Sequence, residues 1–164
     1  MENLSTLTAI SPIDGRYRNK TEQLARYFSE YGLIHYRVLV EVEYFIALCE
    51  LPLPQLKDFS KTCSPDDLRD LYFDFKEEDA ERVKAIERTT NHDVKAVEYF
   101  MKEKMAAMGL EQYSEFVHLG LTSQDINNTA IPYALRDAAH NEYFPVLEEL
   151  VEKLSSLAES WSDF

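Results

Sequence analysis

Apolar side chains recur at intervals of three and four residues along much of the chain, the spacing that gathers them on one face of an α-helix. The repeat is clearest over residues 92–108, and Gly109 directly after it is a typical helix stop. A longer segment begins after Ser29, a favourable N-cap residue, and runs to about residue 51, where prolines follow. Because roughly twenty residues without a turn signal exceed the length of an ordinary strand, we predict a helix there too.

Shorter amphipathic segments account for most of the remaining sequence. A Ser-Pro pair at residues 64–65 predicts the start of a helix that reaches about residue 75, and a charged helix follows over residues 77–88. A last pair of helices is predicted over residues 122–140 and 141–161, and the apolar face of the second is too broad for a lone surface helix. The pattern therefore predicts an all-α fold in which any domain boundary lies in a short connection.

The charge balance limits the partners of the protein. The sequence has 30 acidic and 17 basic residues, a formal net charge of -13. Surfaces that bind nucleic acid or anionic membranes need a basic stripe to displace counterions, so we expect neither partner. No apolar run approaches the roughly 18 residues of a membrane span, and residues 1–11 lack the pattern of a secretory signal. Cys49 and Cys63 lack metal-site or disulfide spacing, and we interpret both as free thiols of a soluble, cytoplasmic protein.

Three polar stretches are candidates for chemistry, and the first covers residues 11–17. Its Pro-x-Asp-Gly sequence predicts a turn, which does not explain the basic and aromatic residues that follow. Arg16 and Tyr17 stand beside Arg18 and Lys20, the one conspicuous basic cluster of an acidic chain. Arginine is the side chain best shaped to grip a phosphate in a bidentate fork. The alternative is that these are ordinary surface arginines in solvent.

The second stretch is residues 89–93, at the start of the clearest predicted helix. At this point the sequence has three consecutive polar residues, Asn91, His92 and Asp93, and helix capping accounts for some of them. The positive end of the helix dipole disfavours a charged imidazolium, which would leave His92 a neutral hydrogen-bonding ring. A capping or core histidine and a substrate-binding histidine both fit this pattern.

The third stretch contains His118 and the polar run at residues 121–128. Thr122 and Asp125 have the spacing of a capping box, with aspartate in place of glutamate or glutamine. The same helix start, with the hydroxyls of Thr122 and Ser123 and its free backbone N–H groups, also suits a carboxylate ligand. Spacing does not choose between the two interpretations. No zinc motif, glycine-rich phosphate loop or dinucleotide fingerprint is present, so no metal or organic cofactor is expected.

In order, these stretches closely resemble the three amino-terminal motifs of the adenylosuccinate lyase family, of the fumarase/aspartase superfamily. They are Ser-Pro-Ile-Asp-Gly-Arg-Tyr, Glu-Arg-Thr-Thr-Asn-His-Asp-Val-Lys-Ala-Val-Glu and Phe-Val-His-Leu-Gly-Leu-Thr-Ser-Gln-Asp-Ile-Asn-Asn. The resemblance implies a helical amino-terminal domain, residues 1–112, followed by the first part of a central helix bundle, residues 113–164, that assembles into a homotetramer. It also implies β-elimination of fumarate from adenylosuccinate to give AMP, and from succinyl-aminoimidazole-carboxamide ribotide, in purine biosynthesis.

The resemblance further implies roles for individual residues. Substrate-binding positions of the family are matched by Arg16, Tyr17, Asn91, His92, Asp93, His118, Thr122 and Ser123. The first two resemble residues that hold the phosphate end, Thr122 and Ser123 a pair that binds a succinyl carboxylate, and His118 a phosphate-side or orienting histidine.

In the same family the general-acid histidine and the catalytic serine lie in motifs beyond Phe164. We therefore expect no catalytic residue within the chain, no activity from it alone, and its last residue to be the end of a fragment. The alternatives are another superfamily lyase, of the argininosuccinate lyase or fumarase type, and a non-catalytic helical oligomerisation fragment. Arg16-Tyr17 and residues 91–93 disfavour the former.

Overall fold

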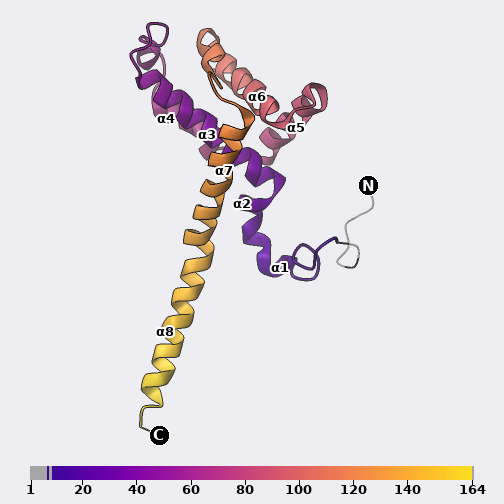
Figure 1. Ribbon diagram of the computed structural model, residues 1–164, viewed down its shortest axis with the longest axis vertical. Helices are drawn as coiled ribbons and strands as arrows, with labels where there is room; N and C mark the ends of the chain where they lie inside the picture. Colours follow the sequence, from indigo (N-terminus) through magenta and orange to yellow (C-terminus); the bar gives the residue numbers. More distant parts are fainter. Residues whose placement is uncertain (1–6, 8, 164) are drawn as a thin grey trace.

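The computed structural model describes residues 7 and 9–163, and every regular element in this part of the chain is a helix (Figure 1). The expectation of an all-α fold is therefore confirmed. Two expectations concern residues that lie largely outside the described part of the chain. They are the lack of a secretory signal in residues 1–11 and the interpretation of residue 164 as the end of a fragment. The elements are α1 (Arg18–Thr21), η1 (Glu22–Leu24), α2 (Ala25–Phe28), α3 (Glu30–Glu50), η2 (Phe59–Lys61), α4 (Pro65–Phe73), α5 (Glu77–Thr90), α6 (Asp93–Ala107), η3 (Glu111–Phe116), α7 (Ser123–Ala138), η4 (Ala139–Tyr143) and α8 (Phe144–Ser160).

Helix α3 is the central element of the fold, in contact with α2, α4, α5, α6 and α7. It begins where the sequence predicts, because the Ser29 hydroxyl oxygen accepts a hydrogen bond from the Gly32 N–H at 3.1 Å. Gly32 lies where α2 crosses α3: a Cβ there would stand 2.7 Å from the Arg26 carbonyl oxygen. Phe45 of α3 and Phe100 of α6, both 1% exposed, belong to the main hydrophobic core.

Helices α5 and α6 form a hairpin whose turn differs slightly from the prediction. Helix α5 continues through Thr90, so Thr89 and Thr90 belong to its last turn and do not cap α6. The helix ends there because Asn91 adopts a left-handed conformation, with φ 53°, while its N–H donates to the Glu87 carbonyl oxygen at 2.7 Å. Helix α4 similarly ends at Phe73, two residues early, since the following segment turns to bury Phe75.

The two last predicted helices, α7 and α8, form one long rod that extends away from the rest of the chain (Figure 1). The single π-helical turn of η4 joins them. Pro145, the second residue of α8, follows this turn closely and has no N–H to donate to the carbonyl of residue 141. Helix α8 has no buried residue, and its broad apolar face, which includes Leu147, Leu150 and Leu154, is exposed. Among the described residues, no helix combines the length and apolarity needed to cross a bilayer.

Candidate functional site

The amino ends of α6 and α7 meet, which brings together two stretches that the sequence identified separately. His92 is the N-cap of α6, and its Nδ1 accepts a hydrogen bond from the Lys95 N–H at 3.2 Å. An imidazole whose Nδ1 accepts, when neutral, carries its proton on Nε2. That Nε2 lies 3.3 Å from Ser123 Oγ, at the first residue of α7. His92 therefore caps one helix and contacts the next, so its capping role and a binding role are compatible.

The start of α7 has the predicted capping-box pair. The Thr122 N–H donates to Asp125 Oδ2 at 2.7 Å, and the Thr122 hydroxyl donates to the same oxygen at 2.9 Å. These hydrogen bonds hold the pKa of Asp125 below its usual range. The hydroxyls of Thr122 and Ser123 are thus fixed at a helix amino terminus, where backbone N–H groups and the dipole favour an anion.

Arg37 of α3 connects these two helix starts and was not identified from the sequence. It is 4% exposed, and its guanidinium donates to Asp93 Oδ2 at 2.6 Å and to Asn127 Oδ1 at 2.9 Å. Burial tends to raise the pKa of Asp93, but the N–H of Val94 and the guanidinium of Arg37 outweigh it and lower the pKa. A single buried side chain therefore ties the start of α6 to the first turns of α7.

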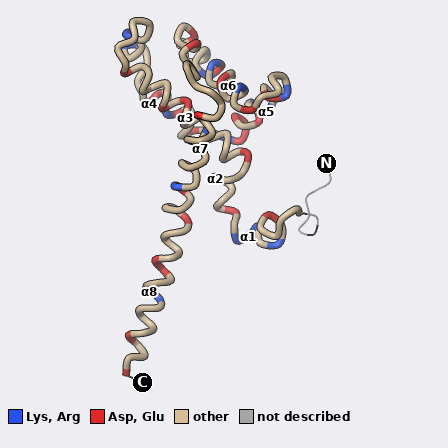
Figure 2. Tube along the Cα trace, in the orientation of Figure 1, with Lys and Arg blue, Asp and Glu red and all other residues tan. Residues whose placement is uncertain are grey.

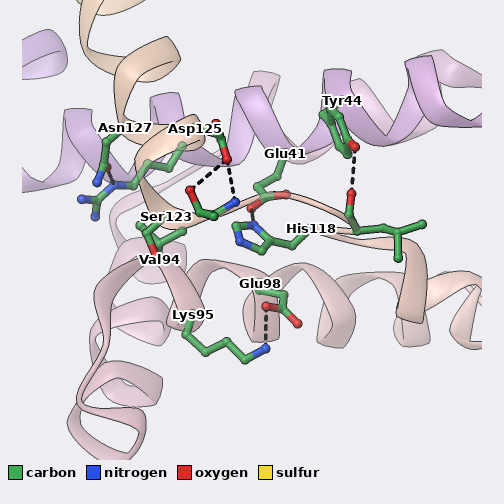
Figure 3. A network of polar contacts seen from close by, with 12 residues as sticks. Glu41, Tyr44, Val94, Lys95, Glu98, His118, Ser123, Asp125 and Asn127 are labelled. Carbon is green, nitrogen blue, oxygen red and sulfur yellow. Dashed lines mark hydrogen bonds and ion pairs between the residues drawn. The ribbon is translucent and has the colours of Figure 1, made fainter.

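His118 lies in the loop before α7 and faces a second buried charge from α3. Figure 3 shows its ring turned toward Glu41, and the two side chains are joined by a contact of 2.5 Å between Nδ1 and Oε1. Burial raises the pKa of Glu41, and the interaction with His118 opposes the rise. His118 has φ 61°, and Asn91 is the other non-glycine residue with positive φ among those described. Both belong to the stretches that the sequence singled out, which agrees with the clustering of strained backbone at functional sites.

Lys95 and Lys102 supply positive charge on α6 beside this region. Lys95 Nζ lies 2.7 Å from Glu98 Oε2 (Figure 3), and Lys102 Nζ lies 3.3 Å from Glu98 Oε1. Burial acts to raise the pKa of Glu98, but the two ammonium groups lower it overall. Glu98 thus balances cations that would otherwise add to the positive field at the helix starts.

Arg16 and Tyr17 are not brought to this site within the chain. Both are exposed, and the Arg16 guanidinium lies over the Tyr17 ring at 5.2 Å from its centroid. Figure 1 places the neighbouring α1 well away from the junction of α6 and α7, and Figure 2 shows basic residues gathered near α1. The eight residues that match binding positions therefore form two separate groups here: Arg16 and Tyr17, and those of residues 91–93 and 118–123.

The second group is partly open to solvent. His92 is exposed, and Asp93, His118 and Ser123 are half-buried. A cavity of about 340 Å³ between α3 and α7 is lined by Leu121 and Asp125, among others, but by none of the eight residues. In the described part of the chain, no group of three or more His, Cys, Asp or Glu side chains is placed to hold a metal ion.

Arg37 and Glu41 were not identified as site residues from the sequence, although their positions on α3 contain a signal that could have found them. Both follow the three- and four-residue spacing of the buried face of α3, which also carries Ile34, Val38 and Phe45. Charged residues at core positions are almost never fully buried unless paired, so each predicts a partner on a neighbouring element. What the sequence does not contain is the identity of those partners, since Asp93 and His118 lie far along the chain.

The motifs agree with comparisons to known proteins. A family model described as lyase matches residues 15–164. The chain is 52% identical over 164 residues to an adenylosuccinate lyase of Dictyostelium discoideum, an alignment that covers 96% of the chain. It is 44% identical over 162 residues, or 98% of the chain, to adenylosuccinate lyases of Vibrio cholerae and Escherichia coli. The chain spans 35% of the length of each of these relatives. On the match to the family model, the chain belongs to the lyase family.

Proposed function

We propose that the full-length lyase containing this chain cleaves adenylosuccinate to AMP and fumarate by β-elimination, as part of purine biosynthesis. Succinyl-aminoimidazole-carboxamide ribotide is cleaved in the same way, to aminoimidazole-carboxamide ribotide and fumarate. The names of the relatives, at 44–52% identity over almost the whole chain, support this substrate class. No metal or organic cofactor takes part in the proposed reaction.

The observation that carries the proposal is the contact between His92 and Ser123. Their side chains are 3.3 Å apart at the starts of two helices, so hydroxyl, imidazole and backbone N–H donors converge on one surface. Such a surface suits a dicarboxylate, because helix amino termini bind anions and the donors are held before the ligand arrives. A succinyl group presents two carboxylates, and the β-elimination passes through a carbanion that one of them stabilises.

The proposed roles follow the position of each residue. Thr122 and Ser123 bind a succinyl carboxylate, and His92, with Asn91 and Asp93 beside it, contacts the reacting part of the substrate. His118 contacts the phosphate side or orients the substrate. Arg16 and Tyr17, in their separate group, bind the phosphate end, which requires that this segment meets the remaining groups in the assembled enzyme. The general acid and the base come from the part of the lyase beyond residue 164.

The assembly and location are also proposed. Residues 1–112 form a helical amino-terminal domain, and residues 113–164 begin a bundle domain through which four copies associate in the cytoplasm. The uncovered apolar face of α8 supports this, since such a face needs helical partners to bury it.

The test is to assay the purified full-length lyase for fumarate and AMP from adenylosuccinate, with argininosuccinate and malate offered in parallel. Release of fumarate and AMP from adenylosuccinate, retained after exhaustive chelation, supports the proposal. Turnover of argininosuccinate or malate with none of adenylosuccinate would assign the chain to another branch of the superfamily.

A further inference from the structure

Glu41 is a buried charge that the stability of the fold does not explain. Its side chain is 0% exposed, and its Oε2 has no hydrogen-bond partner among the described residues. Leaving a buried polar atom unsatisfied costs about 1–3 kcal/mol, and more when the group is charged. A leucine or methionine of similar size would fit this face of α3 without that cost. The side-chain hydrogen bond of Glu41 among the described residues joins its Oε1 to His118 Nδ1, at 2.5 Å.

The loop that carries His118 is held in place by other contacts. Val117 is buried in the main core at 3% exposed, and the Tyr44 hydroxyl donates to the Leu119 carbonyl oxygen at 2.8 Å. These anchors lie on either side of His118 and do not involve Glu41. The contribution of Glu41 is therefore chiefly to the orientation of the ring.

The geometry leaves one ring nitrogen free for a ligand. When His118 donates its Nδ1–H to Glu41 Oε1, Nε2 is the remaining nitrogen, and it has no hydrogen-bond partner among the described residues. A carboxylate that accepts from one imidazole nitrogen fixes both the ring orientation and the tautomer. This restraint matters at His118 because its left-handed backbone, with φ 61°, is itself unfavourable by about 1–2 kcal/mol.

We infer that Glu41 is a positioning residue of the lyase site, which holds His118 with its acceptor nitrogen Nε2 directed at a hydroxyl or N–H donor of the substrate. Glu41 acts through His118 and does not touch the substrate. The inference rests on the proposed function for its kinetic consequence, whereas the orientation and tautomer of the ring are properties of the chain itself.

The kinetic experiment compares Glu41→Gln and Glu41→Leu in the full-length lyase, with Glu43→Gln as the matched control. Glu43 lies two residues further along α3 and pairs with Arg69, outside the site. Groups that orient a functional histidine are typically worth about 10- to 100-fold. We expect KM for adenylosuccinate to rise by about tenfold in Glu41→Gln and further in Glu41→Leu, with a smaller change in kcat. Glu43→Gln is expected to match the wild type, and Glu41→Gln to unfold at no lower temperature than the wild type.

A second measurement separates positioning from a merely structural role. Imidazole ¹⁵N chemical shifts of the 164-residue chain, at a pH where the ring is neutral, are expected to show His118 protonated on Nδ1. In Glu41→Leu the proton is expected to move to Nε2. A wild-type ring protonated on Nε2 alone, or Glu41 variants with wild-type KM, would overturn the inference. If neither the wild type nor Glu43→Gln releases fumarate, the proposed function fails, and the ¹⁵N shifts still decide whether Glu41 positions His118.

Discussion

The guanidinium of Arg37 lies 2.6 Å from the carboxylate of Asp93, the first residue of α6, although 56 positions separate them in the sequence. The same guanidinium reaches Asn127 of α7 at 2.9 Å. Because Asp93 follows His92 directly, this buried arginine fixes the distance between the two helix starts that carry His92 and Ser123. The geometry of the candidate site therefore depends on α3, which has none of the motif residues.

Arg37→Lys in the full-length lyase is expected to lower kcat/KM by about tenfold, because an ammonium group cannot reproduce the two-armed contact of a guanidinium. Because lysine keeps the positive charge, a fall in kcat/KM would reflect the altered geometry of the contacts with Asp93 and Asn127. The measurement is steady-state kinetics on adenylosuccinate, with Arg69→Lys as the control. Arg69 also makes two-armed contacts from its helix, to Glu43, but away from the site. Equal kinetics for Arg37→Lys and the wild type would show that this link does not set the site.

Arg16→Ala is expected to raise KM with little change in kcat. A phosphate contact is made equally in the ground and transition states, so its loss weakens binding without slowing the chemical step. Arg82→Ala is a suitable control, since Arg82 is an exposed arginine that pairs with Glu103 on the surface. A large fall in kcat with unchanged KM would instead indicate that Arg16 takes part in the chemistry.

Glu41 gives a pH dependence that can be measured without substrate. Its pKa is raised from 4.5 in the folded chain by burial, while His118 opposes the rise and Glu98, on α6, adds to it. Because the folded carboxyl keeps its proton to a higher pH than the unfolded one, the contribution of Glu41 to the free energy of unfolding falls as pH rises above 4.5. A tenfold difference in proton affinity between the folded and unfolded states corresponds to about 1.4 kcal/mol of stability.

Relative to the wild type, Glu41→Gln is therefore expected to gain stability as the pH rises. Urea unfolding of both proteins at about pH 5 and about pH 8 measures the difference. The expected sign would be contradicted if the free energy of unfolding of the wild type, relative to that of Glu41→Gln, were larger at about pH 8 than at about pH 5.

The helices and their caps were largely predictable, because they depend on local signals. Ser29, the Thr122-Asp125 pair and Gly109 act where the sequence indicates. The contacts of Arg37 and Glu41 could not be predicted, since partners that lie 56 and 77 positions away depend on how helices cross. The sequence also could not show that Arg16 and Tyr17 stand apart from His92, because only the three-dimensional arrangement separates segments that the motifs group together.

The exposed face of α8 predicts self-association of the 164-residue chain. Leu150 and Leu154 are each more than half exposed, and contiguous apolar patches of this kind normally mark interfaces. Sedimentation is expected to detect oligomers of the chain, and the double variant Leu150→Glu with Leu154→Glu is expected to reduce them. Glu152→Gln, on the opposite side of the helix, serves as the control. An unchanged oligomer in the double variant would place the interface elsewhere.

The 164-residue chain by itself is expected to release no fumarate from adenylosuccinate, although its substrate-binding groups are present. The resemblance to the family assigns proton removal and amine protonation to residues beyond Phe164, and His92, Ser123 and His118 are here interpreted as binding groups. General acid and base assistance is typically worth roughly 10²–10⁴-fold for each group, so binding groups alone leave the elimination immeasurably slow. The assay compares the chain with the full-length lyase, both made in a host without its own lyase. Turnover by the chain would show that proton transfer resides within these residues, with His92 and His118 the first groups to replace.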